Sequence, residues 1–379
     1  MQSVSIADYG AKEGALCTEA IQRALDAASA AGGVAVIPRG TYRTGTLNLR
    51  GASLCLEKGA VLKGSADFAD YPEIGYDHNE MGQVRSLLYV MDEQDVHIYG
   101  EGTIDLSAEA FYGVRITGAP CWTMSFVECE DVREQDLTID NDRRIPNNDG
   151  MHFCSCKGVI VRGCNISAGD DCIAISCITN WDKPCEDVVI ADCILRSSSK
   201  AIVVGYMHSI VRNVNISNCV ILDSNRSLCI MSSTDGIVEN VTASNLRLDT
   251  RCRAGNWWGN GEPIFMMAVK HDYLIPAEQD PHRETDCAIR NVHIDGVTCM
   301  GENAMGIYGV DGNIREVELR NIDFTRKPSK NLPLKGNVFD FAPGRVDFEV
   351  PEDCGLYIGG GADVKLENIN TRAWKIIHA

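Results

Sequence analysis

The sequence predicts an all-β protein of 379 residues, folded as one right-handed parallel β-helix with a capping helix near its N-terminus. Three observations predict this fold class. Helical periodicity is scarce, short β-forming runs recur at a nearly regular spacing, and each run is followed by a residue that tolerates a left-handed backbone. Because the repeat extends over most of the chain, we expect a single domain over residues 1–379, although the length alone suggests two or three.

One segment, residues 18–31, has convincing helical periodicity. Its apolar side chains on one face are Ala20, Ile21, Leu25, Ala28 and Ala31. We expect Thr18 to cap this helix and Gly32-Gly33 to end it. A helix in this place would cover the open strand edges at one end of a solenoid.

Nine valines mark the repeat. They are Val96, Val132, Val159, Val188, Val214, Val241, Val292, Val317 and Val364. Five of the spacings are 25 to 29 residues, one is 36, and the longest two, 51 and 47, are close to two units. Two residues after each valine the side chain is apolar, except at Glu134, and four residues after each valine all nine residues are Gly, Asn or Asp. These three residue types accept a left-handed corner.

Each unit is thus a short strand, a corner and a second short strand. One coil cannot bury its inner face alone, whereas stacked coils can. Parallel strands with no helices between them therefore predict a parallel β-helix. A β-sandwich, the alternative, would have hairpin turns and does not explain a corner residue at coil spacing.

The charge and cysteine content exclude several classes of function. A net charge of −18 argues against nucleic acid and anionic membranes as partners, and no apolar run is long enough to span a membrane. The 17 cysteines form no CxxC pair, so we expect no structural zinc site. We expect no cofactor either. Cysteines without a visible signal peptide predict a cytoplasmic protein with buried thiols, or a secreted one if a leader is missing from the sequence. The oligomeric state is not indicated.

Two acidic motifs lie one coil apart, Asn147-Asn148-Asp149-Gly150 and Gly169-Asp170-Asp171-Cys172. In a stacked solenoid Asp149 and Asp170 would lie on neighbouring rungs, about 4.8 Å apart. Crowded carboxylates raise the pKa of at least one of them, which suits a general acid beside a general base. Each motif alone is more typical of a turn than of a catalytic site, but their coil-matched spacing favours a catalytic site.

With these paired motifs the sequence resembles glycoside hydrolase family 28, the polygalacturonase family, which carries N-x-D-G and, one coil later, G-D-D-C. Segments such as Ile37-Pro38-Arg39-Gly40 and Gly100-Glu101-Gly102-Thr103 also resemble that family. The resemblance implies an inverting glycosidase that needs no metal. By that resemblance Asp170 is the general acid, Asp149 and Asp171 hold and deprotonate the attacking water, and Asn147 positions the substrate or the carboxylates.

The sequence departs from the family at two motifs. The family's G-H-G falls at Ser199-Lys200-Ala201, and its R-I-K falls at Cys229-Ile230-Met231. In polygalacturonases that Arg and Lys bind the galacturonate carboxylate, which Cys and Met cannot do. The expected substrate is therefore a pectin-derived or related oligosaccharide, containing uronic acid or rhamnose, that is shorter or less charged than polygalacturonate.

Other residues are candidates for substrate binding. Lys200 lies on the coil next to the second acidic motif, and Arg226 precedes the altered motif. Arg143 and Arg144 precede the first acidic motif. The Gly- and Asn-rich loop 251–262 interrupts the repeat and contributes Arg253, Trp257, Trp258 and Glu262. Aromatic faces stack on sugar rings, and Arg and Glu bind hydroxyl or carboxylate groups. The alternative is that the charges are solvated and the tryptophans only hold the loop to the body.

The sequence leaves two other functions open. One is a β-helix polysaccharide lyase or epimerase, and the other is a carbohydrate-binding solenoid without activity. In each case the expected partner is an oligosaccharide or polysaccharide.

Overall fold

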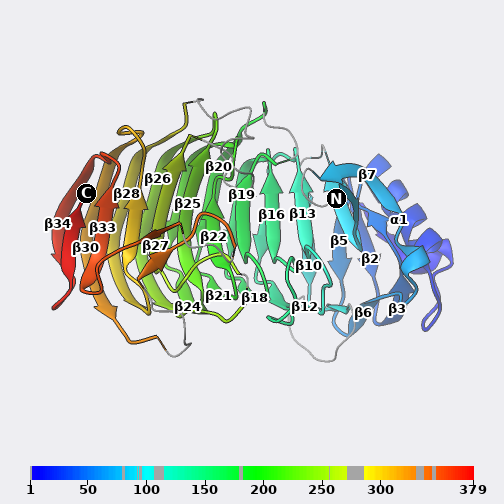
Figure 1. Ribbon diagram of the computed structural model, residues 1–379. Helices are drawn as coiled ribbons and strands as arrows, with labels where there is room; N and C mark the ends of the chain where they lie inside the picture. Colours follow the sequence, from blue (N-terminus) through cyan, green and yellow to red (C-terminus); the bar gives the residue numbers. More distant parts are fainter. Residues whose placement is uncertain are drawn as a thin grey trace.

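The computed structural model describes residues 2–78, 82–91, 93, 96–105, 115–178, 182–255, 257–270, 286–329, 337–343 and 347–379. Within these residues the chain winds into coils that stack from the N-terminal end, at the right of Figure 1, to the C-terminal end at the left. Neighbouring coils are joined by parallel strand pairs. The predicted right-handed parallel β-helix is confirmed.

One long parallel sheet has sixteen strands among the described residues. In chain order these are β3 (Gly40–Thr44), β6 (Ala60–Gly64), β11 (Thr103–Asp105), β12 (Arg115–Thr117), β14 (Arg133–Gln135), β15 (Thr138–Asp140), β17 (Lys157–Arg162), β18 (Asn165–Ala168), β20 (Cys185–Ala191), β21 (Ile194–Ser197), β23 (Ile210–Ser217), β24 (Val220–Ser224), β26 (Ile237–Thr250), β28 (Ala288–Gly301), β30 (Ile314–Arg326) and β34 (Val364–Asn370). The long strands β26, β28 and β30 bend round a corner and join two ladders into this one sheet.

The second long sheet has eleven described strands, and the two acidic motifs lie directly before two of them. It comprises β4 (Leu47–Asn48), β9 (Leu88–Met91), β13 (Met124–Val127), β16 (Met151–Cys154), β19 (Ile173–Ser176), β22 (Lys200–Val204), β25 (Arg226–Ser233), β27 (Ile264–Val269), β29 (Met305–Tyr308), β33 (Cys354–Gly359) and β35 (Lys375–His378).

Smaller elements complete the described fold. A four-stranded parallel sheet near the N-terminus contains β1 (Ser3–Ser5), β2 (Val34–Ile37), β5 (Ser53–Leu56) and β10 (Ile98–Gly100). Two antiparallel pairs are β7 (Glu73–His78) with β8 (Gly82–Arg85) and β31 (Val338–Phe339) with β32 (Phe348–Glu349). Two 3₁₀ turns span Ile6–Tyr9 and Phe68–Asp70.

All nine predicted corner residues have a positive φ, including Gly100 (121°) and Asp136 (55°). Asparagine has a second role at these corners, because its side-chain amide bonds to the equivalent residue on the next coil. Asn245 donates to Asn218 over 2.8 Å, and Asn368 donates to Asn321 over 2.7 Å. The corners are therefore linked along the stack as well as turned.

The two longest spacings are each a single coil with an insertion. Val241 pairs directly with Val292, and Val317 pairs directly with Val364. The reading of these spacings as close to two units is therefore corrected, because no further coil separates the paired strands of this sheet among the described residues.

The core lies inside the coils. Along β23, for example, Val211, Val214 and Ile216 are buried while the residues between them face outward. All 17 cysteines are free thiols, and most are buried, as Cys164 and Cys193 are. They pack as small apolar side chains.

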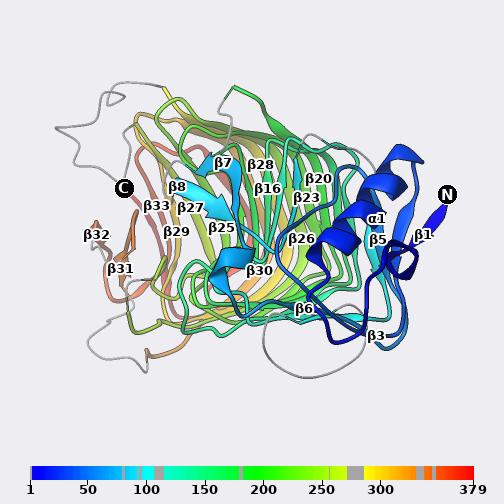
Figure 2. The ribbon, with the colours of Figure 1, turned by 90° about the vertical axis from the view of Figure 1, so that its right-hand side faces the viewer.

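The helix α1 (Thr18–Ala30) lies across the N-terminal end of the coils, as Figure 2 shows. It buries Ala20, Ile21, Leu25 and Ala28 of the predicted apolar face, but Ala31 lies beyond its end and is exposed. Its N-cap residue is Cys17 and not Thr18. The Thr18 hydroxyl instead accepts the amide of Gly45 over 2.8 Å, which joins the helix to the chain beyond β3. Among the described residues, no helix is long and apolar enough to cross a membrane.

Candidate active site

The two acidic motifs form adjoining loops, one between β15 and β16 and one between β18 and β19. The side chain of Asn148 joins them: its Oδ1 accepts the amide of Gly169 over 2.5 Å, and its Nδ2 donates to the carbonyl of Asp142 over 2.8 Å. A Cβ at Gly169 would lie 2.0 Å from the carbonyl oxygen of Ile145, so glycine is required at this close approach.

Asp149, Asp171 and Lys200 occupy the same register position on three successive coils. The pairing of β16 with β19 and of β19 with β22 sets this alignment. The sequence predicts Asp149 and Asp170 on neighbouring rungs, but the residue in register with Asp149 is Asp171, and Asp170 precedes it in the same loop. The structure thus brings the three predicted catalytic aspartates together.

Asp149 is buried and bonded to a histidine. Its Oδ2 lies 2.6 Å from Nε2 of His152, on the adjoining strand β16. Burial lowers the pKa of His152 to about 3, so its ring is neutral near pH 7. Burial first, and then the negative charge of Asp170, raise the pKa of Asp149 well above the ordinary range. Asp149 Oδ1 is buried with no partner among the described residues, and it can accept a hydrogen bond from a bound molecule.

Asp171 is held by Lys200. The Nζ of Lys200 lies 3.4 Å from Asp171 Oδ2, and the Lys200 amide donates to Asp171 Oδ1 over 3.2 Å. Burial raises the pKa of Asp171, and the positive charge of Lys200 opposes that rise. Lys200 itself is only 2% exposed, so it acts mainly on the carboxylates beside it.

Asp170 is the more accessible carboxylate, since it is half-buried while Asp149 and Asp171 are buried. Its Oδ2 accepts a hydrogen bond of 3.3 Å from the backbone amide of Asn147. Asn147 is exposed and has a left-handed backbone (φ 58°), which turns its amide toward Asp170. One accessible carboxyl therefore lies beside two buried ones.

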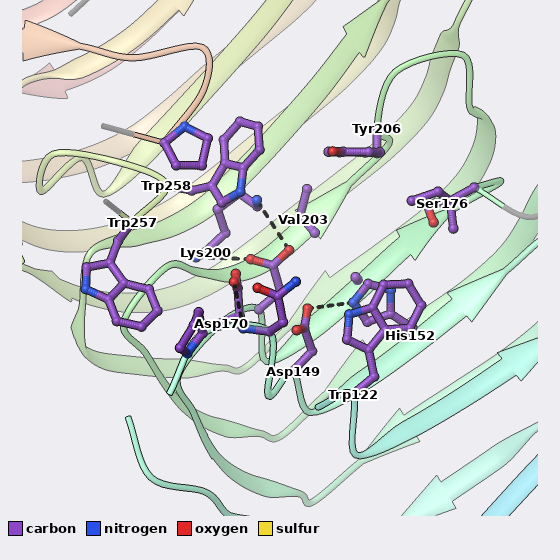
Figure 3. Close-up of a pocket in the computed structure, with 16 residues that line it drawn as sticks. Trp122, Asp149, His152, Asp170, Ser176, Lys200, Val203, Tyr206, Trp257 and Trp258 are labelled. Carbon is purple, nitrogen blue, oxygen red and sulfur yellow. Dashed lines mark hydrogen bonds and ion pairs between the residues drawn. The ribbon is translucent and has the colours of Figure 1, made fainter. Parts of the chain in front are cut away.

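These groups line a pocket of about 470 Å³ (Figure 3). Its walls are formed by Trp122, Pro146, Asn147, Asp149, His152, Asp170, Asp171, Ala174, Ser176, Ile178, Lys200, Val203, Tyr206, Trp257, Trp258 and Pro343. This volume is within the range of small-molecule sites. Of the predicted substrate-binding residues, Asn147, Lys200, Trp257 and Trp258 lie in the pocket wall.

Aromatic rings enclose the charged groups. Trp122 stacks on His152 with ring centroids 3.5 Å apart, and Trp258 lies 4.0 Å from the ammonium of Lys200. Tyr206 meets Trp258 edge-on at 6.2 Å. The pocket thus has flat apolar faces around polar groups, and a sugar ring can stack on such faces.

The ligand atoms of Asp149, His152 and Asp171 all lie within 4.8 Å of one another. The carboxylate and imidazole types would suit a divalent cation, but the ammonium of Lys200 already supplies a positive charge beside Asp171. We therefore interpret the space between the two carboxylates as a water site.

Arg226 and Glu262 do not line the pocket, and their predicted role in substrate binding is corrected. Both side chains are fully buried. Arg226 Nη2 lies 3.0 Å from Glu262 Oε1 and 2.8 Å from Asp340 Oδ1, and its guanidinium lies over the Phe265 ring. The three charges hold the loop before β27 to residues 337–343 from inside the protein.

Arg253 also lies outside this pocket. Its Nη2 donates to the carboxylate of Asp223 over 3.0 Å. With Arg143 and Arg144 it lines a second hollow beside Trp257.

Sequence reasoning missed His152, Trp122 and Tyr206 as pocket residues. The available signal for His152 was its position three residues after Asp149, where the chain enters strand β16. Trp122 needed the strand register, because it is in register with Asp149 only when β13 pairs with β16.

Comparisons with known proteins agree with this architecture. Residues 103–332 match the model of glycosyl hydrolases family 28. The chain is 28% identical over 223 residues to a probable polygalacturonase of Vitis vinifera, which covers 48% of this chain and 45% of that protein. It is 24% identical over 195 residues to an exopolygalacturonase of Platanus acerifolia, covering 45% and 52%. The matches thus span about half the length of these curated relatives.

Solved structures share the fold. A hyperthermoactive exopolygalacturonase of Thermotoga maritima superposes with a TM-score of 0.65 at 18% identity, covering 87% of this chain and 88% of that one. A family 28 exopolygalacturonase of Yersinia enterocolitica gives 0.63 at 18% identity, covering 98% and 78%. Because the family match extends over more than half of the sequence, the chain belongs to glycosyl hydrolases family 28.

Proposed function

We propose that the protein is an inverting glycoside hydrolase that cleaves pectin-derived or related oligosaccharides. The observation that carries this proposal is the division of the three aspartates: Asp149 and Asp171 are buried with oxygens within 4.8 Å of each other, and the more exposed Asp170 shares their pocket. Family membership supports the same reaction class.

In the proposed reaction a water held between Asp149 and Asp171 attacks the anomeric carbon. The water loses a proton to this carboxylate pair as the glycosidic C–O bond breaks, and Asp170 gives its proton to the leaving oxygen. The positive charge of Lys200 opposes the rise in the pKa values of this pair and so favours their ionised form, and His152 orients Asp149. Attack from the face opposite the leaving group inverts the anomeric carbon.

The substrate class rests on the pocket and on relatives. The Vitis and Platanus relatives are named polygalacturonases, and the aromatic walls suit a sugar ring. We therefore propose a galacturonate- or rhamnose-containing oligosaccharide as the substrate. We also propose a cytoplasmic location, which the 17 free cysteines support because thiols persist in a reducing compartment.

The test is hydrolysis of defined pectic oligosaccharides by the wild type and by Asp170→Asn, followed by proton NMR of the newly formed anomer. We expect inversion by the wild type and a loss of about 100-fold or more in the variant. Asp311→Asn, on an exposed surface, is the matched control. Unsaturated products that absorb ultraviolet light would instead indicate a lyase, and sugar binding without turnover would indicate a binding protein.

A further inference from the structure

Three arginines converge on one aspartate beside the active-site pocket. The carboxylate oxygen Oδ2 of Asp223 lies 2.8 Å from Arg143 Nη1, 3.0 Å from Arg253 Nη2 and 3.2 Å from Arg251 Nη2. These residues come from the loop after β15, from the end of β24 and from the loop after β26. We call Arg143, Arg251 and Arg253 the arginine cluster.

The cluster carries more positive charge than its partner neutralises. Three guanidinium groups face one carboxylate, which leaves two positive charges in a protein whose net charge is −18. Arg144, the fourth arginine nearby, pairs with Asp142 and adds no excess. An unbalanced pair of positive charges attracts an anion.

The arginines are also partly buried. The side chains of Arg143 and Arg253 are each 18% exposed, and the Nε atoms of both are buried with no hydrogen-bond partner among the described residues. Burial and the charge of Arg143 lower the pKa of Arg253 to about 10, although Asp223 opposes this effect. The site thus holds like charges close together.

The hollow above the cluster adjoins the active-site pocket. It has a volume of about 400 Å³ and is lined by Arg143, Arg144, Ser198, Arg251, Arg253, Ala254 and Trp257. Trp257 also lines the catalytic pocket (Figure 3), so the two spaces share this residue. A chain of sugars that leaves the catalytic pocket past Trp257 would enter the hollow.

We infer that the arginine cluster is a binding subsite for an acidic sugar of the oligosaccharide, one that carries a carboxylate or a sulfate. The planar guanidinium groups offer paired N–H donors that match either anion, and the face of Trp257 is available to the ring of the same or the preceding sugar. This inference rests on the proposed function, and it supplies from other residues an anion site that Cys229 and Met231 cannot provide.

The experiment measures equilibrium binding by calorimetry in the Asp170→Asn background, at low salt. The ligands are trigalacturonate, its fully methyl-esterified form and a galactotriose carrying a sulfate ester. The variant Arg251→Gln/Arg253→Gln is compared with the matched double variant Arg162→Gln/Arg290→Gln, whose arginines pair with Asp192 and Glu239 elsewhere on the surface. Circular dichroism checks folding, and the single variant Arg251→Gln, at the most exposed member, provides a second measurement.

We expect Arg251→Gln/Arg253→Gln to bind trigalacturonate at least tenfold more weakly and the methyl ester equally well, and we expect the control to bind both normally. A loss confined to the sulfated ligand would support the subsite with sulfate as its anion. Equal affinity of the parent protein for the acidic and esterified ligands, or binding of none of them, would overturn the inference. Hydrolysis is measured separately, so a failure of the proposed function is distinguishable from a failure of the subsite.

Discussion

Lys200 lies one coil after Asp171, and its ammonium nitrogen is 3.4 Å from the Asp171 carboxylate. Both side chains are almost completely shielded from solvent, so this ion pair is only weakly screened. Trp258 covers the ammonium at 4.0 Å. The charge on Lys200 therefore influences whether the active-site carboxylates are ionised near neutral pH.

The first prediction concerns Lys200→Met. Lys200 lowers the pKa of both Asp149 and Asp171, so its removal raises those pKa values further. A base works only when ionised, and the acid limb of kcat/KM should therefore move to higher pH, by about one unit or more. The measurement is a pH–rate profile, with the exposed Lys157→Met as the control. A lower rate with an unchanged acid limb would contradict this role.

The second prediction concerns His152→Ala. The hydrogen bond from His152 orients Asp149, and bonds to charged groups contribute about 1.5–3 kcal/mol. We expect kcat to fall about 10- to 100-fold with little change in KM, because the ring acts on Asp149 and not chiefly on substrate. Steady-state kinetics measure this split. His293→Ala, at an exposed site, should behave as wild type, and a rise in KM alone in His152→Ala would show a substrate contact instead.

The third prediction concerns Arg226→Met. This change leaves Glu262 and Asp340 buried without their cation and should reduce the free energy of unfolding by about 3–5 kcal/mol. Burial already raises the pKa of Asp340 to about 7, and loss of Arg226 raises it further. The destabilisation should therefore be larger at pH 8 than at pH 5.5, where Asp340 takes up a proton.

Chemical denaturation of Arg226→Met at the two pH values measures this difference, with the exposed Arg290→Met as the control. Stability equal to that of the wild type at pH 8 would show that the buried ion network does not hold the loops.

The fourth prediction concerns Glu134, the one polar residue among the nine inward positions of the repeat. It is 1% exposed, and neither carboxylate oxygen has a partner among the described residues. Burial raises its pKa in the folded protein well above that of the unfolded chain. Its contribution to stability is therefore most favourable below its unfolded pKa, near 4.5, and is lost as the pH rises through the folded pKa.

Glu134→Leu should increase the free energy of unfolding by about 1–3 kcal/mol at neutral pH, with a larger gain as the pH rises. Urea denaturation across pH 5 to 9 measures it, and the exposed Glu19→Leu is the control. A variant less stable than wild type at pH 8 would refute the account.

The coil and its corners could be predicted from the sequence because both depend on residues that are close together along the chain. Asn218 or Gly163 at a corner needs only its own backbone freedom, and all nine such positions were predictable. The acidic motifs were likewise visible, since a coil-length spacing brings them together whatever their neighbours.

The contents of the pocket were less predictable because they depend on the register across coils. Arg226 and Glu262 are 36 residues apart and meet only through the pairing of β25 with β27. An isolated arginine in a sequence is usually exposed, so its expected role was substrate contact. The register across coils also decides that Asp171, and not Asp170, is aligned with Asp149.

The direct pairing of Val241 with Val292 has a consequence for how such a protein can change. Fifty residues intervene between these partners, yet the rungs before and after them stay aligned. A segment can therefore be lengthened, shortened or replaced within one turn of the solenoid without moving any other turn. The wall that contains Trp257 belongs to this turn, so selection can alter that wall of the pocket while Asp149, Asp170 and Asp171, which lie on earlier turns, keep their positions.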